Sequence, residues 1–234
     1  FQGINNSMDI TTLGRGGSDT TAVAIAAALK ADKCEIYTDV NGIYTADPRI
    51  VPNAVLLESI DYNVMLNYSS LGAKVLHNRS VELAKNTGID ISVKSSFSDN
   101  PGTLVTDCSE INSKPISGIT AEKLQAYITI SNLNDVYSLL KLLSINKTII
   151  DMVSISDKCI SFSAKQSEIE SILNKVKSIN EQIKTEVQSD LAKISIVGTS
   201  LHTKPEVLIK IVEVLKANNI NFTAISLSET KLCI

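Results

Sequence analysis

A glycine-rich segment followed by an acid carries the clearest chemistry in this chain. It reads Thr-Thr-Leu-Gly-Arg-Gly-Gly-Ser-Asp over residues 11–19, directly before a stretch rich in helix-forming residues. Glycines let the backbone approach a ligand closely, and a helix N-terminus directs unpaired N–H groups at an anion. Arg15 adds a bidentate donor suited to a carboxylate or a phosphate. The segment therefore predicts an anion-binding loop, beside which Asp19 could orient a metal or another cation. The alternative is a flexible turn capped by Ser18 or Asp19.

A second segment, residues 35–49, combines a predicted strand with a polar loop. Residues 35–40 have the composition of a strand, and an Asn-Gly turn leads from them into the loop. Open α/β sheets bind ligands at such strand ends. Tyr44 could pack on a nucleobase and Arg49 could reach phosphates, although Tyr44 alone also fits a loop anchor.

A third segment, residues 71–80, places Lys74 and Arg79 near a predicted helix that continues to Ala84. Taken singly, Lys74 fits a solvated helix charge. The three segments together, in this order, are a more specific indication of a ligand-binding site than any one of them alone.

Strands and helices are expected to alternate up to about residue 106. Such alternation indicates an α/β domain with a largely parallel sheet. A turn signal at residues 98–102 and an aperiodic polar stretch from 107 mark a domain boundary. The predicted strands span residues 34–40, 89–97 and 102–106, and the predicted helices span 19–30, 58–68 and 70–86.

After this boundary the chain contains an internal repeat. Leu208 stands in the second copy where Val136 stands in the first, and both begin a helical apolar pattern. Each copy predicts a strand, a helix and two further strands, which is the ferredoxin-like pattern. The first strands are expected at 126–131 and 193–198, a further helix at 168–179, and the second copy ends within its third strand.

The three segments resemble the second half of the catalytic domain of aspartokinases, within the amino-acid kinase superfamily. The resemblance rests on T-T-L-G-R-G-G-S-D-x-T-A, T-D-V-x-G-I-Y-T-x-D-P-R and L-G-A-K-V-L-H, and the repeat resembles the regulatory ACT pair of that family. It implies an α/β fold in which the C-terminal half of an amino-acid kinase domain precedes two ferredoxin-like ACT domains. The implied boundaries are 1–106 for the kinase part, 107–116 for a linker, 117–190 for the first ACT domain and 191–234 for the second.

The resemblance also implies an activity. Enzymes of this family use ATP and Mg²⁺ to phosphorylate the side-chain carboxylate of L-aspartate, giving 4-phospho-L-aspartate. Asp19 would orient a catalytic lysine that lies outside this chain, Arg15 would bind the α-carboxylate of aspartate, and no side chain is assigned to a metal. The implied aspartate-binding residues are Arg15, Gly16, Gly17 and Ser18, and the implied ATP-binding residues are Thr38, Asp39, Tyr44, Arg49, Lys74 and Val75.

The sequence departs from the family pattern in three places. A Lys-Phe-Gly-Gly-Thr-Ser type loop, which grips the phosphates, does not occur in the 234 residues. We therefore expect the chain to be a fragment that is inactive alone. Asn78 replaces a usual Pro, which affects the backbone after His77, and Asn41 is assigned only a turn role.

In this family the ACT pair binds an end-product amino acid, lysine or threonine, and lowers activity. Ser131 and Asn132 precede the first helix of the repeat, whose N–H groups could take the effector's carboxylate. Asp151 could pair with its α-amino group, and Thr223 stands at the equivalent position of the second copy. The alternative is a helix cap and a solvated Asp151. Pairing of sheet edges predicts a homodimer or a higher homo-oligomer.

The amino-acid composition argues against some kinds of binding partner and indicates a cellular compartment. A net charge of −3, 4% aromatic residues and no Trp argue against nucleic-acid binding, and no apolar run is long enough to span a membrane. The cysteines lack zinc-site spacing and indicate a reducing, cytoplasmic setting. His77 and His202 are interpreted as structural. The four cysteines are Cys34, Cys108, Cys159 and Cys233.

The preferred function is an aspartokinase that catalyses the first step of lysine, threonine and methionine synthesis under feedback control. One alternative is a non-catalytic, amino-acid-binding regulatory subunit, which would not need Arg15, Asp19 and Tyr44 in register. Another is a kinase acting on a different carboxylate or on a nucleotide, which would leave the ACT-like pair unexplained.

Overall fold

The computed structural model describes residues 2–73, 75–107, 116–145, 148–179 and 183–234. The chain divides into two compact units. The first comprises Phe1–Thr120, Ser195–Val207 and Ser228–Lys231, and the second comprises Ala121–Ile194, Leu208–Leu227 and Leu232–Ile234.

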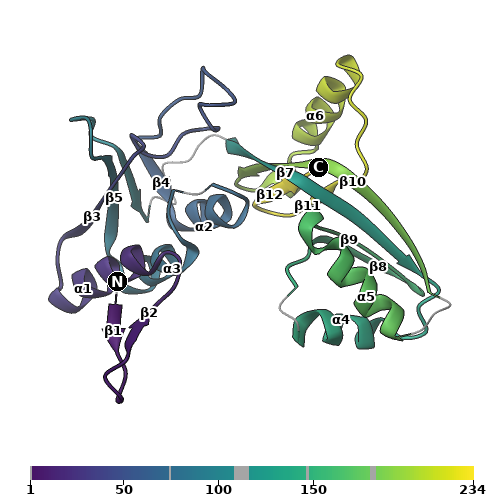
Figure 1. Cartoon of the computed structure of the whole chain (residues 1–234). Coiled ribbons are helices and arrows are strands. Elements are labelled where there is room, and N and C mark those ends of the chain that lie inside the picture. The colour runs from purple at the N-terminus through teal and green to yellow at the C-terminus, as the bar shows by residue number, and fades with distance from the viewer. Residues whose placement is uncertain (1, 74, 108–115, 146–147, 180–182) are drawn as a thin grey trace. The chain divides into compact units, whose positions relative to one another are not determined.

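A four-stranded sheet forms the centre of the first unit (Figure 1). Its strand order is β3 (Lys33–Thr38), β5 (Asp90–Ser95), β6 (Thr103–Thr106) and β4 (Ser59–Asp61). The pairs β3–β5 and β4–β6 are parallel, whereas β5–β6 is antiparallel. The sheet is therefore largely parallel, as the alternating pattern predicts.

Three helices accompany this sheet: α1 (Gly17–Leu29), α2 (Tyr62–Ser70) and α3 (Asn78–Thr87). Helix α1 packs against α3 and β3, and α2 packs against α3. A small antiparallel hairpin, β1 (Gln2–Ile4) with β2 (Ile10–Thr12), precedes them. Buried apolar side chains, including Val23, Met65, Val81, Ile91 and Val93, make up the core of this unit.

Two helix predictions in this unit are wrong at their starts. The helix predicted at 58–68 begins at Tyr62, because Ser59–Asp61 pairs with β6 as strand β4 and Asp61 then caps the helix. The helix predicted at 70–86 begins at Asn78. Helix α2 ends at Ser70, and Gly72 follows with φ of 103°, a conformation that does not continue a helix.

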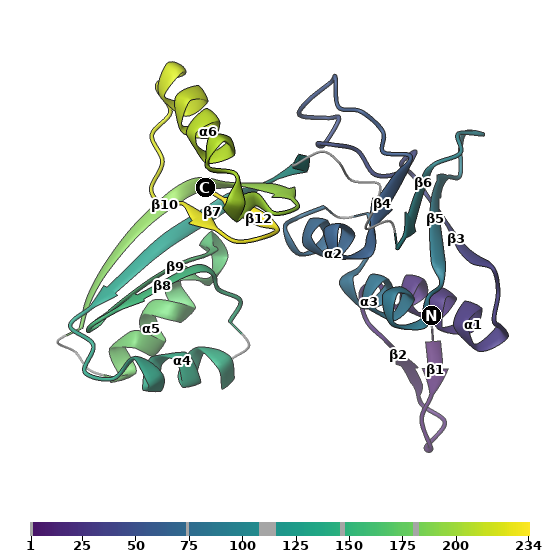
Figure 2. The ribbon, with the colours of Figure 1, turned by 180° about the vertical axis from the view of Figure 1, so that it is seen from behind.

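The remaining strands form a six-stranded sheet in the order β11-β12-β10-β7-β9-β8 (Figure 2). Its long strands are β7 (Ile116–Ser131) and β10 (Lys184–Gly198). The other strands are β8 (Asp151–Ser156), β9 (Cys159–Lys165), β11 (Ser226–Leu227) and β12 (Lys231–Cys233).

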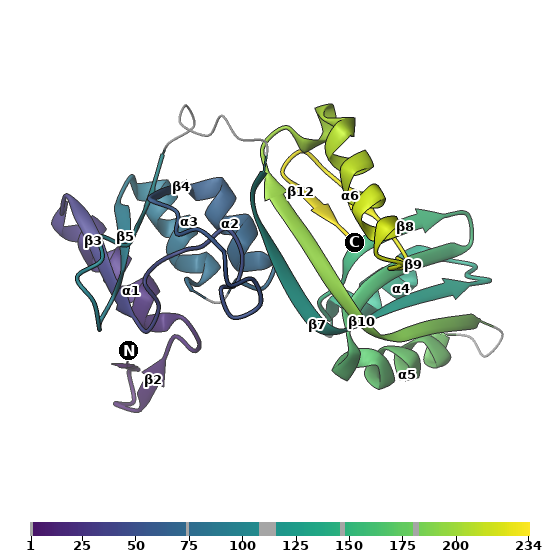
Figure 3. The same cartoon turned by 90° about the horizontal axis from the view of Figure 1, so that it is seen from above.

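Helices α4 (Val136–Ile145) and α5 (Ile169–Ile179) cover one face of β7, β8 and β9 (Figure 3). Alternate strand residues such as Ile128 and Phe162 point into this core and meet Leu139 and Ile172 from the helices. The order β7-α4-β8-β9-α5 matches the pattern predicted for the first copy. The predicted α/β class of the chain is confirmed.

The second copy is less regular than the first. Its helix is α6 (Pro205–Ala217), preceded by a short 3-10 turn at Leu201–Thr203. The apolar pattern at 222–229 predicts a strand like β8, but only Ser226–Leu227 pairs, with Leu232 and Cys233 of β12.

The predicted linker at 107–116 falls almost wholly on residues outside the described part, so the domain boundaries stay predictions. In the part of the chain that the structure describes, every helix is too short or too polar to cross a membrane.

Candidate functional site

The glycine-rich loop turns sharply into helix α1. Gly14 and Gly16 have φ of 75° and 72°, in the left-handed region that favours glycine. The N–H of Gly17 donates to the carbonyl of Gly14 at 3.1 Å, which closes the turn. A Cβ on Gly16 would lie 2.4 Å from the Cβ of His77, so a larger residue does not fit there.

The capping alternative for this loop is wrong. Gly16 is the N-cap of α1 and makes no side-chain capping bond, while Ser18 and Asp19 lie inside the first turn. The hydroxyl of Ser18 donates to Asp19 at 3.3 Å rather than to the helix end. The first N–H groups of α1 thus lack a side-chain cap and lie beside the exposed Arg15, an arrangement suited to an anion.

Arg79 holds this loop from the start of helix α3. Its Nη2 donates to the carbonyl of Arg15 at 2.7 Å and to that of Leu13 at 3.0 Å. His77 caps α3 by accepting from the N–H of Arg79, and it also packs against Gly16. The sequence pattern placed Arg79 near the site but gave it no role, because the pairing joins residues more than sixty positions apart.

The end of strand β3 carries the second predicted group. Thr38 donates its hydroxyl to Asp39 at 3.1 Å, and its carbonyl accepts from Ser96 at 2.8 Å. Because β3 and β5 are parallel, with Thr38 opposite Ser95, their carboxyl ends meet at one edge of the sheet. This edge is where ligands bind in open α/β sheets.

The loop after this strand is fixed by Thr103 of β6, whose side chain is fully buried. Its hydroxyl accepts from the N–H of Ile43 at 2.8 Å and donates to the carbonyl of Leu57 at 2.6 Å. Tyr44 forms an isolated bridge with Leu56 and accepts from Asn41 at 3.5 Å. Tyr44 is therefore anchored at its backbone, and its ring is half-buried.

Arg49 is paired with Asp47. Its Nη2 lies 2.8 Å and its Nε 3.0 Å from the two carboxylate oxygens, which is a bidentate contact. The hydrogen bonds from Arg49 lower the pKa of Asp47, and Asp47 raises that of Arg49. Asp47, which sequence reasoning did not select, thus sets the direction of this guanidinium. Lys74 lies outside the described residues, and Val75 is half-buried.

The structure does not bring the predicted effector residues together: Ser131 at the end of β7 pairs with Cys159 of β9, whereas Asp151 at the start of β8 pairs with Ser163, four residues further along β9. Ser131 is the last residue of β7, and Asn132 follows with a left-handed φ of 62°. The start of α4 is already capped, because Asp135 accepts from the N–H groups of Tyr137 at 2.9 Å and Ser138 at 3.3 Å. These N–H groups were expected to bind an effector carboxylate, and Asp135 occupies that place here.

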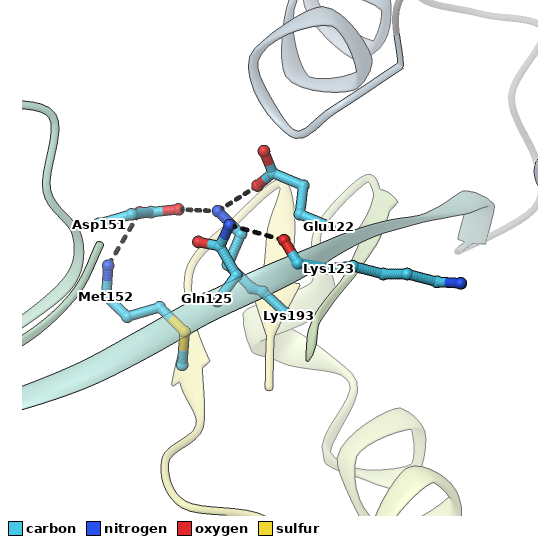
Figure 4. A network of polar contacts seen from close by, with 6 residues as sticks. All are labelled: Glu122, Lys123, Gln125, Asp151, Met152 and Lys193. Atoms are coloured by element: carbon cyan, nitrogen blue, oxygen red, sulfur yellow. Dashed lines mark hydrogen bonds and ion pairs between the residues drawn. The ribbon is translucent and has the colours of Figure 1, made fainter. Parts of the chain in front are cut away.

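Asp151 is ion-paired rather than solvated (Figure 4). Its Oδ2 lies 3.0 Å from the Nζ of Lys193, and Glu122 of β7 holds the same Nζ at 2.7 Å. Burial disfavours the charged form of Lys193, but the bonds to Glu122 and Asp151 outweigh it and raise the pKa. Sequence reasoning missed Lys193 because the three residues come from separate strands.

The first part of the chain resembles a known family. Residues 1–95 match the model of the amino acid kinase family. Aspartokinase 2 of Bacillus subtilis is 43% identical to this chain over 244 residues, which cover 99% of this chain and 60% of that protein. The chain thus spans about 60% of the length of the curated relatives it matches. The resemblance to aspartokinases is confirmed.

Two solved structures extend this similarity. E. coli aspartokinase III in complex with aspartate and ADP (R-state) aligns with a TM-score of 0.84 and 29% identity, over 100% of this chain and 55% of that one. The same enzyme in complex with lysine and aspartate (T-state) aligns with a TM-score of 0.78 and 28% identity, over 100% of this chain and 54% of that one.

Proposed function

We propose that the protein containing this chain is an aspartokinase, which transfers a phosphoryl group from ATP to the side-chain carboxylate of L-aspartate. The observation that carries the proposal is the glycine loop before α1. Its helix end lacks a side-chain cap, Arg15 is exposed beside it, and Arg79 holds its carbonyls. The homologues named above, one of them solved with aspartate and ADP, support the same substrates.

In this proposal the loop binds aspartate. Arg15 pairs with the α-carboxylate, and the N–H groups around Gly16, Gly17 and Ser18 complete the anion site. Asp19 lies in the first turn of α1, where it orients a cationic group at the transfer site. The roles of these side chains are positioning and charge neutralisation, which phosphoryl transfer mainly requires.

The nucleotide belongs at the carboxyl edge of β3 and the loop after it. Thr38 and Asp39 lie at this edge, Tyr44 offers its half-buried ring, and Arg49 has a guanidinium fixed by Asp47. Lys74 and Val75 are assigned to the same pocket. Mg²⁺ is assigned to the phosphates of ATP, where the ion would neutralise their charge.

Regulation is assigned to the two ferredoxin-like ACT domains at 117–190 and 191–234. An effector amino acid, lysine or threonine, is assigned to Asp151 of the first domain, because Ser131 and Asn132 lie toward the other end of β9 within the chain. The relative solved with lysine supports lysine as an effector. Strand β8, at the end of its sheet, offers an edge for pairing in a homodimer.

The proposal is tested with the full-length protein that contains this chain. ADP release is measured with ATP and Mg²⁺ in the presence of L-aspartate, L-glutamate or a nucleoside monophosphate. We expect release that depends on aspartate and is far slower with the other acceptors. Equal rates with glutamate, or a preference for the nucleotide, would assign the site to a different kinase.

A further inference from the structure

Lys193 is the most completely buried charged side chain beside the proposed effector site. Its side chain is 8% exposed, and its partners Asp151 and Glu122 are 29% and 23% exposed. Figure 4 shows the ammonium group between the two carboxylates, which come from β8 and β7, while Lys193 comes from β10. A buried cation of this kind is stable only when it is paired.

The Lys193 ammonium pairs with the Asp151 carboxylate, to which the α-ammonium of the effector amino acid is assigned. Both groups are point charges with three donors and the same preference for a carboxylate. From this geometry we propose that Lys193 is an internal competitor that sets the affinity of the effector site. An arriving α-ammonium displaces Lys193 from Asp151, and Glu122 keeps the displaced Lys193 charge paired. The inference rests on the proposed effector role of Asp151.

Glu122 makes this exchange feasible. It holds the Lys193 Nζ at 2.7 Å, closer than Asp151 does at 3.0 Å. Lys193 can therefore leave Asp151 without becoming an unpaired buried charge, which would be costly. The three groups sum to one negative charge, so one added ammonium leaves the cluster neutral.

Ser163 supplies a second observation. It lies opposite Asp151 in the β8–β9 register, so both side chains are on the same face of the sheet. Ser163 is 5% exposed, and its hydroxyl has no hydrogen-bond partner among the described residues. A buried, unpaired hydroxyl beside the carboxylate can accept from an incoming ammonium.

The test measures binding of L-lysine and L-threonine to the full-length protein by calorimetry. Lys193→Met removes the competitor, and we expect about tenfold tighter binding of the amino acid that binds the unmodified protein. Glu122→Gln removes the carboxylate that would keep Lys193 paired after it leaves Asp151. Lys193 should then compete more strongly, and we expect the amino acid to bind at least about threefold more weakly. Lys123→Met is the matched control, since Lys123 is an exposed neighbour on β7 whose side chain points away from the cluster. It should not change the affinity, and Nα-acetyl-lysine should not bind.

Unchanged or weaker binding by a folded Lys193→Met protein would overturn the inference. So would an equal effect of Lys123→Met, or no binding of either amino acid to the unmodified protein. If Lys193→Met does not fold, Glu122→Gln decides, because unchanged or tighter binding contradicts competition. Aspartate-dependent ADP release is measured separately, so a failure of the kinase proposal is distinguishable from a failure of this one.

Discussion

At the scale of single residues, the loop before α1 depends on a guanidinium that makes no proposed contact with substrate. Arg79 donates to two carbonyls of the loop, at 2.7 and 3.0 Å. Charged donors form stronger hydrogen bonds than neutral ones, so this side chain can hold the loop even though it is exposed.

Arg79→Gln should therefore raise the KM for aspartate about tenfold, while the KM for ATP changes little. Arg79→Lys keeps the charge and should recover part of the loss. Steady-state kinetics of the full-length protein would show this, with Lys85→Gln on the same helix as a control, because Lys85 pairs with Asn63 instead. A rise in both KM values to the same degree would mean that Arg79 only stabilises the domain.

At the scale of elements, Thr103 ties the loop after β3 to strand β6. Thr103→Val keeps the shape but leaves the N–H of Ile43 and the carbonyl of Leu57 without their partner. We expect the free energy of unfolding to fall by about 1–3 kcal/mol, as measured by urea denaturation. Thr106→Val, on the same strand with a half-buried side chain, should cost less than about 0.5 kcal/mol. Equal losses would show that the Thr103 hydroxyl has no special role.

An ion pair between Glu35 of β3 and Lys94 of β5 also joins these two strands. Bonds from Lys94, and then from Lys33, lower the pKa of Glu35 to about 2. A carboxyl group whose pKa is lower in the folded than in the unfolded protein stabilises the fold at pH values above its unfolded-state pKa. This stabilisation is lost as the pH falls through the folded-state pKa. Stability should therefore drop between about pH 5 and pH 2, and the drop should be shallower in Glu35→Gln. Denaturation at a series of pH values measures it, with the exposed Glu82→Gln as control. Parallel profiles for both variants would contradict the assignment.

At the scale of the whole molecule, the sequence predicts local order better than long-range pairing. Helix α1, strands β3 and β5 and the first repeat follow from residue patterns, because their signals lie within a few positions. The three-residue strand β4 was missed, since it exists only through pairing with β6. The same limit applies at the site. Motif residues such as Arg15 and Asp19 can be chosen as site residues from the sequence. The roles of Arg79, Asp47 and Lys193 are visible only from the side chains and carbonyls that they contact in the fold.

The central claim is that Arg15 in the glycine loop binds the α-carboxylate of aspartate. β-Alanine has the reacting carboxylate and the amine of aspartate but lacks that α-carboxylate. The direct measurement is the ratio of kcat/KM for aspartate over β-alanine, in the full-length protein and in its Arg15→Ala variant. We expect the unmodified protein to prefer aspartate strongly, because β-alanine leaves Arg15 unpaired, and we expect Arg15→Ala to lose about a hundredfold or more of this preference. An unchanged ratio in Arg15→Ala would contradict the account, because Arg15 would then not bind the α-carboxylate.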